Sequence, residues 1–260
     1  MAEPGGGAGP GGGAGRGEAD LAAVGALVGE PARARLLQAL LDGRALPAGV
    51  LAAEAGVAAS TGSGHLSRLV DGGLVRVERH GRHRYYRLAG PEVALALEAM
   101  AALAPAVPVR SLRQDTRARA LRRARTCYDH LAGELGVALL SALLERRVLT
   151  GHDGSFRPEV DRLAAPGADV CYRLTEQGAT FLGALGVCCE APGRRRLLRH
   201  CVDWSEQRHH LSGALGAALA TTMTTSGWVV PGPVRRSLRV TRSGADALAE
   251  HFGIDAAPFR

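Results

Sequence analysis

The sequence predicts a mainly α-helical chain with small β-wings, an α+β fold. A winged helix-turn-helix comes first, and a duplicated, winged-helix-like C-terminal module follows it. Three observations lead to this prediction. Apolar residues recur at helical spacing from residue 21 onward. An arginine-rich hairpin pattern follows the fourth predicted helix. Several motifs in residues 110–260 occur twice.

The first predicted helices follow a tail that we expect to be disordered. Residues 1–18 are almost entirely Gly, Ala and Pro, and such a segment buries too little surface to offset the entropy lost on ordering. A helix is expected from Leu21, where apolar residues begin to recur every three or four positions. Pro31 favours the start of a second helix, and the turn at Asp42-Gly43 ends it.

The rest of this first domain, residues 19–105, has the order that reading a DNA major groove requires. The elements are predicted as helix, helix, strand, strand and helix, over residues 47–54, 60–71, 74–78, 83–88 and 91–103. Ser60 or Ala59 is expected to cap the second of these helices. A helix fits the major groove, and a basic hairpin reaches the flanking phosphates.

Polar side chains on the 60–71 helix and arginines of the hairpin are the candidate DNA contacts. Hydroxyl groups can contact base edges or phosphates, and arginine can bind guanine through two hydrogen bonds. The candidates are Ser60, Thr61, Ser63, Ser67, Arg68, Arg79, Arg82 and Arg84.

Several nearby residues have two interpretations. Gly62 and Gly64 either let the backbone approach DNA or are neutral drift, the interpretation we favour. His65 either packs at a helix junction, which we favour, or belongs to a sensor. Of Tyr85 and Tyr86, one is expected to pack inward and the other to be free.

Residues 20–105 resemble the ArsR/SmtB family of winged-helix repressors. The similarity is carried by residues 31–37, by the 51–69 stretch with His65-Leu-x-x-Leu, and by the Gly81-Arg-x-Arg-Tyr-Tyr pattern. The resemblance implies a homodimer built from the first and last helices of this segment, a palindromic double-stranded DNA operator, and release of DNA on sensing an effector. The 47–54 helix has no cysteine, and the 91–103 helix lacks Asp-x-His and His-x-x-Glu, so the metal sites of some family members are absent there.

Composition agrees with an intracellular, DNA-binding protein. The formal net charge is +7 and the pI is about 9.8, which favours a polyanionic partner. No apolar run is long enough for a membrane span, and no signal-peptide pattern opens the chain. Five cysteines are an odd number, so a disulfide framework is not indicated. We expect a cytoplasmic, nucleoid-associated protein.

The second part of the chain consists of two copies of one unit, over 110–187 and 188–260. The run His130–Gly136 is echoed by His210–Gly216. The motifs Cys-x-Asp and Arg-x-Thr-x-x-Gly also occur once in each copy. Each unit is expected to be a long helix, two strands and a helix. The arginine-rich stretch 110–125 either contacts DNA phosphates or is a solvated helix face.

The repeat places a cysteine and a histidine at equivalent positions of each copy. Cys127 and His130 are expected one helical turn apart, and Cys201 and His210 are their counterparts. Two thiolates and two imidazoles would suit a zinc-like ion. An oxidant sensor, a soft ligand or haem is the alternative, and buried packing is the plainest interpretation. The Cys188-Cys189 pair is expected to be incidental, with binding of a thiophilic ion as the alternative.

These observations predict a homodimeric, sequence-specific DNA-binding repressor that is not an enzyme. The alternative is a thiol- or metal-dependent sensor or enzyme that uses the Cys/His pairs. A weaker possibility is a purely dimerising or scaffold role for residues 110–260. No nucleophile–base motif or phosphate-binding loop stands out in the sequence.

Overall fold

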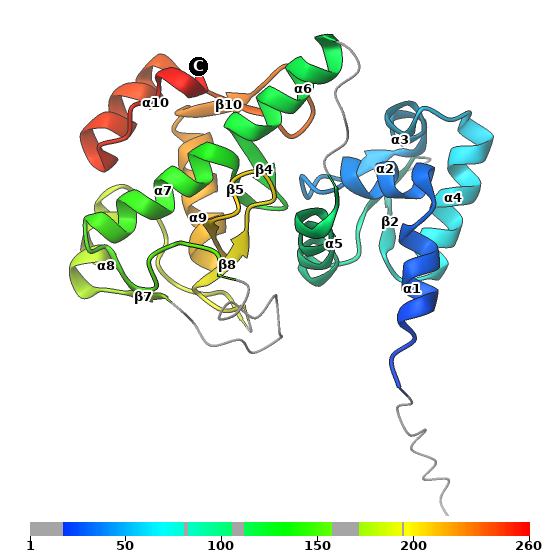
Figure 1. Cartoon of the computed structure of the whole chain (residues 1–260), viewed down its shortest axis with the longest axis horizontal. Coiled ribbons are helices and arrows are strands. Elements are labelled where there is room, and N and C mark those ends of the chain that lie inside the picture. Colours follow the sequence, from blue (N-terminus) through cyan, green and yellow to red (C-terminus); the bar gives the residue numbers. More distant parts are fainter. Residues whose placement is uncertain (1–17, 81–82, 106–111, 158–171, 194) are drawn as a thin grey trace, which may run out of the picture.

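Two lobes make up the chain, and helix α5 (Pro91–Leu103) lies between them (Figure 1). The computed structural model describes residues 18–80, 83–105, 112–157, 172–193 and 195–260. Predictions for the tail up to residue 17 and for Arg82 therefore lie outside the described residues. Within those ranges, no helix is both long enough and apolar enough to cross a membrane.

The N-terminal lobe has the predicted helix-turn-helix and wing. Its remaining elements are α1 (Leu21–Val28), α2 (Pro31–Ala39), β1 (Leu46–Pro47), α3 (Ala48–Ala55), α4 (Ala59–Asp71), β2 (Val75–His80) and β3 (His83–Leu88). The three strands form an antiparallel sheet in the order β1-β3-β2. The core beneath it is built from leucines of three helices, including Leu36, Leu40, Leu51, Leu66 and Leu69.

Local signals account for these helix ends. Pro31 opens α2, and the Glu30 carboxylate accepts the Arg33 N–H at 2.8 Å as a cap. Helix α3 ends at Gly56 in the left-handed conformation. Helix α4 begins one residue earlier than predicted, with Ala58 at its cap, so the prediction of Ser60 or Ala59 as the cap was wrong.

The C-terminal lobe repeats one element order, hairpin, helix, hairpin, helix. The first copy contains β4 (Arg125–Cys127), β5 (His130–Ala132), α7 (Gly133–Glu145), β6 (Leu149–Gly151), β7 (Tyr172–Leu174) and α8 (Glu176–Ala184). The second contains β8 (Arg199–Val202), β9 (His209–Ser212), α9 (Gly213–Thr225), β10 (Val229–Pro231), β11 (Leu238–Val240) and α10 (Arg242–Ala247). Helix α6 (Leu112–Arg123) precedes the first copy, and a π-helical turn (Leu248–Phe252) and a 3₁₀ turn (Ala257–Phe259) end the second.

The two copies interlock. Helix α7 packs against β9 of the other copy, α9 packs against β5, and β5 contacts β9. A Cβ at Gly136 would lie 3.5 Å from the Cβ of His210, and one at Gly216 would lie 3.4 Å from the Cβ of His130. The closest approaches are within each copy, where a Cβ at Gly136 would lie 2.5 Å from the Leu131 carbonyl oxygen and one at Gly216 2.6 Å from that of Leu211. These glycines thus let each helix approach its own hairpin.

The hairpins that begin each copy correct one prediction. Cys127 and His130 were placed on a helix, but they end β4 and begin β5, facing each other across the hairpin. The Tyr128-Asp129 turn between them needs a left-handed residue, and Tyr128 supplies it with a φ of 58°. The resemblance of each copy to a winged helix stays a prediction.

Candidate nucleic-acid interface and buried cysteine–histidine cluster

Helix α4 presents a polar face to solvent. Leu66 and Leu69 are buried on its inner side. The outer side carries all five candidate residues of this helix, and each is exposed: Ser60, Thr61, Ser63, Ser67 and Arg68. The helix therefore offers hydroxyl groups and a guanidinium group on the side that a DNA groove would meet.

The two glycines inside α4 have different surroundings. Gly62 is buried, and a Cβ there would lie 2.7 Å from the Cβ of Ala52 on α3. Its role is thus close packing of the two helices of the helix-turn-helix, which neither interpretation from the sequence included. Gly64 is exposed and has open space around it, so its interpretation as drift or as a DNA approach stays a prediction.

The wing carries two exposed arginines that face each other. Arg79 on β2 and Arg84 on β3 are cross-strand partners next to the hairpin tip. Arg87 instead forms hydrogen bonds within the lobe, donating to Glu78 at 3.0 Å and to the Gly43 carbonyl at 2.7 Å. Tyr86 is the tyrosine that packs into the core.

His65 lies at a helix junction. Its Nδ1 is 3.6 Å from a carboxylate oxygen of Glu30, the residue that caps α2, and its side chain is mostly buried. This environment agrees with the packing interpretation. Among the described residues, the only group of three or more possible metal ligands lies elsewhere, in the C-terminal lobe.

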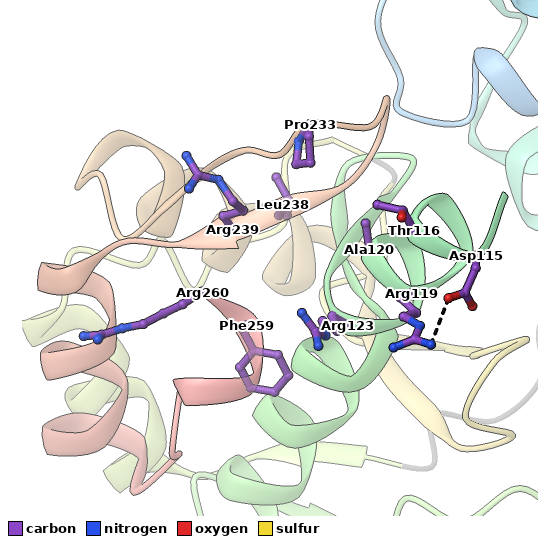
Figure 2. Close-up of a pocket in the computed structure, with 10 residues that line it drawn as sticks. All are labelled: Asp115, Thr116, Arg119, Ala120, Arg123, Pro233, Leu238, Arg239, Phe259 and Arg260. Atoms are coloured by element: carbon purple, nitrogen blue, oxygen red, sulfur yellow. Dashed lines mark ion pairs between the residues drawn. The ribbon is translucent and has the colours of Figure 1, made fainter. Parts of the chain in front are cut away.

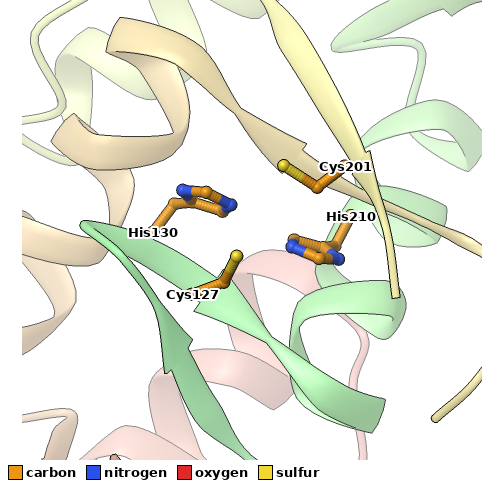
Figure 3. Close-up of side chains that lie close together, drawn as sticks. All are labelled: Cys127, His130, Cys201 and His210. Carbon is orange, nitrogen blue, oxygen red and sulfur yellow. The ribbon is translucent and has the colours of Figure 1, made fainter. Parts of the chain in front are cut away.

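That group consists of the four residues that the repeat singled out. The ligand atoms of Cys127, His130, Cys201 and His210 all lie within 4.8 Å of one another (Figure 3). Each side chain points into the same buried space, and none of the four residues is more than 6% exposed. The structure therefore brings together the two pairs that the sequence placed 74 to 80 positions apart.

Each pair comes from one hairpin. Cys127 and His130 are cross-strand partners in β4 and β5, and Cys201 and His210 are partners in β8 and β9. The rings of the two histidines are stacked with centroids 5.1 Å apart. The interlocking of the two copies is what sets one Cys/His pair against the other.

An aspartate lies behind each histidine. Asp129 Oδ1 is 3.3 Å from His130 Nδ1, and Asp203 Oδ2 is 3.4 Å from His210 Nδ1. The Nε2 atoms of both histidines are buried and have no hydrogen-bond partner among the described residues. His210 Nδ1 likewise has no hydrogen-bond partner there. Only the Asp129–His130 pair therefore has the hydrogen bond by which a carboxylate orients an imidazole ring at a metal site and leaves the other nitrogen for the ion.

Asp203 is the centre of a fully enclosed network. One of its oxygens accepts from the Arg125 guanidinium at 2.9 Å and from the Gly133 N–H at 2.7 Å. The other accepts from the N–H and hydroxyl of Ser205 and from the Glu206 N–H. Burial alone would raise the pKa of the Asp203 carboxyl, but Arg125 and these donors hold it well below its usual range.

The counterpart in the first copy is more open. Asp129 binds Arg195 through two bonds of 2.7 and 3.0 Å. The side chains of Asp129 and Arg195 are 31% and 34% exposed, whereas those of Asp203 and Arg125 are 0% exposed. The two halves of the cluster are thus alike in chemistry and unequal in burial.

The two histidines of the cluster have opposite pKa shifts. Burial alone would lower the pKa of His130, but Cys127 and Asp129 raise it to about 9. Two effects hold the pKa of the Cys127 thiol well above its ordinary value. The larger is a hydrogen bond with the Cys201 sulfur, and the second is burial of the thiol. Burial and the neighbouring His130 ring hold the pKa of His210 well below its ordinary value. Neutral imidazole is the form that binds metal ions, and a thiol binds them after it loses its proton.

The cluster touches the winged-helix lobe through α5. Leu95 packs against Cys127, Ala132 and Cys201. Glu98, which is buried on the same helix, accepts from Arg236 at 2.6 Å. Arg236 in turn donates to the Thr126 carbonyl and accepts the Thr126 N–H, directly beside Cys127. A continuous set of contacts therefore joins the cluster to α5.

A second concave feature is the basic groove beside α6 (Figure 2). Its lining residues are Asp115, Thr116, Arg119, Ala120, Arg123, Pro233, Leu238, Arg239, Phe259 and Arg260, and its volume is about 310 Å³. Arg119 is paired with Asp115 at 2.8 Å. The arginine-rich stretch thus lines a surface groove with its α6 part, while its last member, Arg125, is fully buried. Contact of this stretch with DNA phosphates stays a prediction.

Sequence reasoning identified only part of the residues that surround the cluster. The sequence predicts Arg125 as part of a solvated or DNA-contacting stretch, and it gives no prediction for Arg195, Glu98 or Arg236. Asp129 and Asp203 were recognisable because they belong to the repeated Cys-x-Asp motif. No motif identifies Arg125, Arg195 or Arg236, because this chain has many arginines and the partners of these three lie far away in the sequence.

This chain is similar in sequence to known transcriptional regulators. A family model described as "Helix-turn-helix domain" matches residues 28–78. The HTH-type transcriptional regulator YdfF of Bacillus subtilis (strain 168) is 38% identical over 237 residues, which are 90% of this chain and 98% of YdfF. The HTH-type transcriptional regulator CmtR of Mycobacterium tuberculosis (strain ATCC 25618 / H37Rv) is 45% identical over 80 residues, 31% of this chain and 67% of CmtR.

Two solved structures also match the N-terminal lobe. An NMR structure of the cadmium metal-sensor CmtR from Mycobacterium tuberculosis covers 35% of this chain and 94% of its own, at 40% identity and a TM-score of 0.29. The homodimeric winged helix-turn-helix domain of Mb0332 from Mycobacterium bovis covers 34% and 88%, at 29% identity and a TM-score of 0.30.

Proposed function

This chain belongs to the ArsR family of HTH-type transcriptional regulators, and from that premise we propose that it is a homodimeric repressor that leaves a palindromic operator when its C-terminal module binds an effector. The observation that carries the proposal is the exposed polar face of α4 beside two exposed wing arginines. A regulator needs no catalytic groups, and the protein acts on DNA in the cytoplasm.

The proposed DNA contacts divide into two kinds. On α4, Arg68 and the hydroxyl residues face the groove, where they discriminate between base pairs. On the wing, Arg79, Arg82 and Arg84 contact phosphates, which strengthens binding without regard to sequence. The proposal therefore separates a sequence-specific contribution to DNA affinity, from α4, from a salt-dependent contribution, from the wing.

Selection of duplexes from a random DNA pool by the purified protein tests this function. We expect an inverted repeat with half-sites about one helical turn apart. Arg68→Ala should weaken binding to that site by about 1–3 kcal/mol and relax base preference at one position in each half-site. Replacing Arg79 and Arg84 with alanine should weaken all sequences alike and reduce the salt dependence.

Arg173→Ala provides the control for loss of a positive charge, because Arg173 is exposed on β7 in the other lobe. It should bind DNA like the unmodified protein. A pool that shows no enrichment, or Arg68→Ala binding with unchanged affinity and preference, would exclude the proposed reading of DNA.

The proposed dimer would use apolar side chains on α1 and α5. Leu21 and Leu103 are 80% and 73% exposed, and Val24 on α1 and Met100 on α5 are also exposed. Exposed apolar residues that gather on two helices are typical of an association surface. A second copy of the chain is the occupant that we propose, in keeping with the family resemblance.

Charged residues at these positions should separate the dimer. We expect the double variant Leu21→Glu and Leu103→Glu to sediment as a monomer in analytical ultracentrifugation, with at least a tenfold loss of operator affinity. Leu112→Glu is the matched control, since Leu112 is 86% exposed at the start of α6. A double variant that stays dimeric would place the interface elsewhere.

A further inference from the structure

We propose that Cys127, His130, Cys201 and His210 bind one thiophilic divalent ion, with Zn²⁺ as its probe, and that α5 carries the effect to the DNA-binding lobe. The first part stands on the cluster alone. The second part rests on the proposed function, because its readout is DNA affinity.

The donor set fits a tetrahedral ion of borderline softness. Two sulfur and two nitrogen ligands are a common set for structural zinc. The two Nε2 atoms are buried without partners, and a buried polar atom without a partner is costly unless something binds it. Asp129 bonds to the Nδ1 side of the His130 ring and so orients it for coordination. His210 Nδ1 lies 3.4 Å from Asp203 Oδ2, and neither nitrogen of that ring has a hydrogen-bond partner among the described residues.

The distances between the four ligand atoms fit a single metal ion. With zinc–ligand bonds of roughly 2.0–2.3 Å, neighbouring ligand atoms of a tetrahedral site lie roughly 3.3–3.8 Å apart. The four ligand atoms here lie within 4.8 Å of one another, so binding requires a contraction of about 1.5 Å at most. Because the residues are almost fully buried, the site favours a bare ion over haem or an organic thiol ligand.

Contraction would act on the contacts that join the cluster to α5. Drawing Cys127 and Cys201 together moves the surface on which Leu95 packs. It also moves Thr126, which holds Arg236 and thereby Glu98 of α5. The neighbouring Arg235 binds Glu54 of α3 at 2.9 Å, so the same turn contacts the helix-turn-helix. The proposed path is therefore physically continuous.

Cobalt titration of the reduced, chelator-treated, full-length protein tests the site directly. We expect one Co²⁺ per chain, with visible bands of tetrahedral cobalt and a near-ultraviolet thiolate charge-transfer band that excess Zn²⁺ removes. Competition with a chromophoric chelator should show a loss of Zn²⁺ affinity of at least about 100-fold in Cys127→Ser and in Cys201→Ala, because each removes one of four ligands.

Two cysteines outside the cluster, the exposed Cys188 and the half-buried Cys189, give the matched control. Cys188→Ser with Cys189→Ser removes two thiols from the same lobe but outside the cluster, and it should bind cobalt with an unchanged spectrum. Far-ultraviolet circular dichroism establishes that each variant is folded. The site is overturned if the unmodified protein binds no ion, if the spectrum is octahedral, or if the Cys188/Cys189 variant alone loses binding.

The transmission part has its own readout. Zn²⁺ should weaken operator binding of the unmodified protein by about 5–150-fold, the usual range for coupling between two sites. Glu98→Gln keeps the shape of the side chain but removes the charge that holds Arg236, so it should bind Zn²⁺ and lose most of the DNA response. Zinc binding with unchanged DNA affinity would refute the transmission and leave the site standing. A protein that binds zinc but no DNA would instead refute the proposed function.

Discussion

Asp203→Asn is expected to destabilise the C-terminal lobe by about 3–5 kcal/mol, because it leaves the buried Arg125 guanidinium without its counter-charge. Both oxygens of Asp203 accept hydrogen bonds, one from Arg125 and Gly133 and the other from Ser205 and Glu206. An asparagine has an amide NH₂ in place of one oxygen. Whichever way the amide turns, that group faces donors and cannot accept from them.

The measurement is urea unfolding followed by tryptophan fluorescence in the presence of a chelator. Both tryptophans of the chain, Trp204 and Trp228, lie in the C-terminal lobe, so the signal reports on that lobe alone. Trp204 stacks on Arg125, with the guanidinium carbon 4.5 Å from the ring centre. The same residue therefore reports on the network that the substitution breaks.

Asp129→Asn is the matched control, since Asp129 has the same place in the other copy. Its side chain and that of Arg195 are each about one-third exposed, so water takes up the charge that the substitution releases. We expect a loss of about 1 kcal/mol or less. Equal losses for the two variants would show that burial does not decide the strength of these networks.

Two alanine substitutions in one helix should have opposite signs. Gly178 and Gly183 both lie in α8, but a Cβ at Gly178 would fall on the carbonyl oxygen of Val148 and 2.8 Å from its Cα. Backbone atoms cannot move aside as a side chain does, so Gly178→Ala should cost about 3 kcal/mol. Gly183 has open space, and Gly183→Ala should stabilise the lobe by about 0.5–1 kcal/mol through its helix propensity.

The same fluorescence-monitored unfolding measures both variants. The expectation extends to the second copy, because Thr241 caps α10 as Thr175 caps α8, and Gly244 lies against Trp228 as Gly178 lies against Val148. If Gly178→Ala unfolds at the same urea concentration as the unmodified protein, then the start of α8 can shift away from the β6–β7 hairpin without loss of stability.

Local signals in the sequence predicted the N-terminal lobe well. Pro31 marks the start of α2, and β3 and α5 have the bounds that periodicity predicts. Strand β1 was missed, because two residues are too few to show a period. Ser60 was expected at the cap because serine favours that position, whereas Ala58 holds it through backbone geometry alone.

The C-terminal lobe shows what local signals leave out. The repeat identified the four ligand candidates, but Tyr128-Asp129 lacks the glycine or asparagine that usually marks a tight hairpin, so the strands were taken for a helix. The meeting of the two Cys/His pairs depends on how the copies interlock, which no motif within one copy encodes. Glu98 and Arg236 were missed for the same reason, because they come from α5 and the β10–β11 turn.

The crossed packing of α7 on β9 and of α9 on β5 has an evolutionary consequence. An ancestral chain with a single unit would have needed a second molecule to complete the four-residue cluster, and symmetry would have tied every mutation to its mirror image. Two units within one polypeptide are free of that constraint. Each side can change alone, and the enclosed Arg125–Asp203 pair opposite the partly exposed Arg195–Asp129 pair shows that the two sides differ.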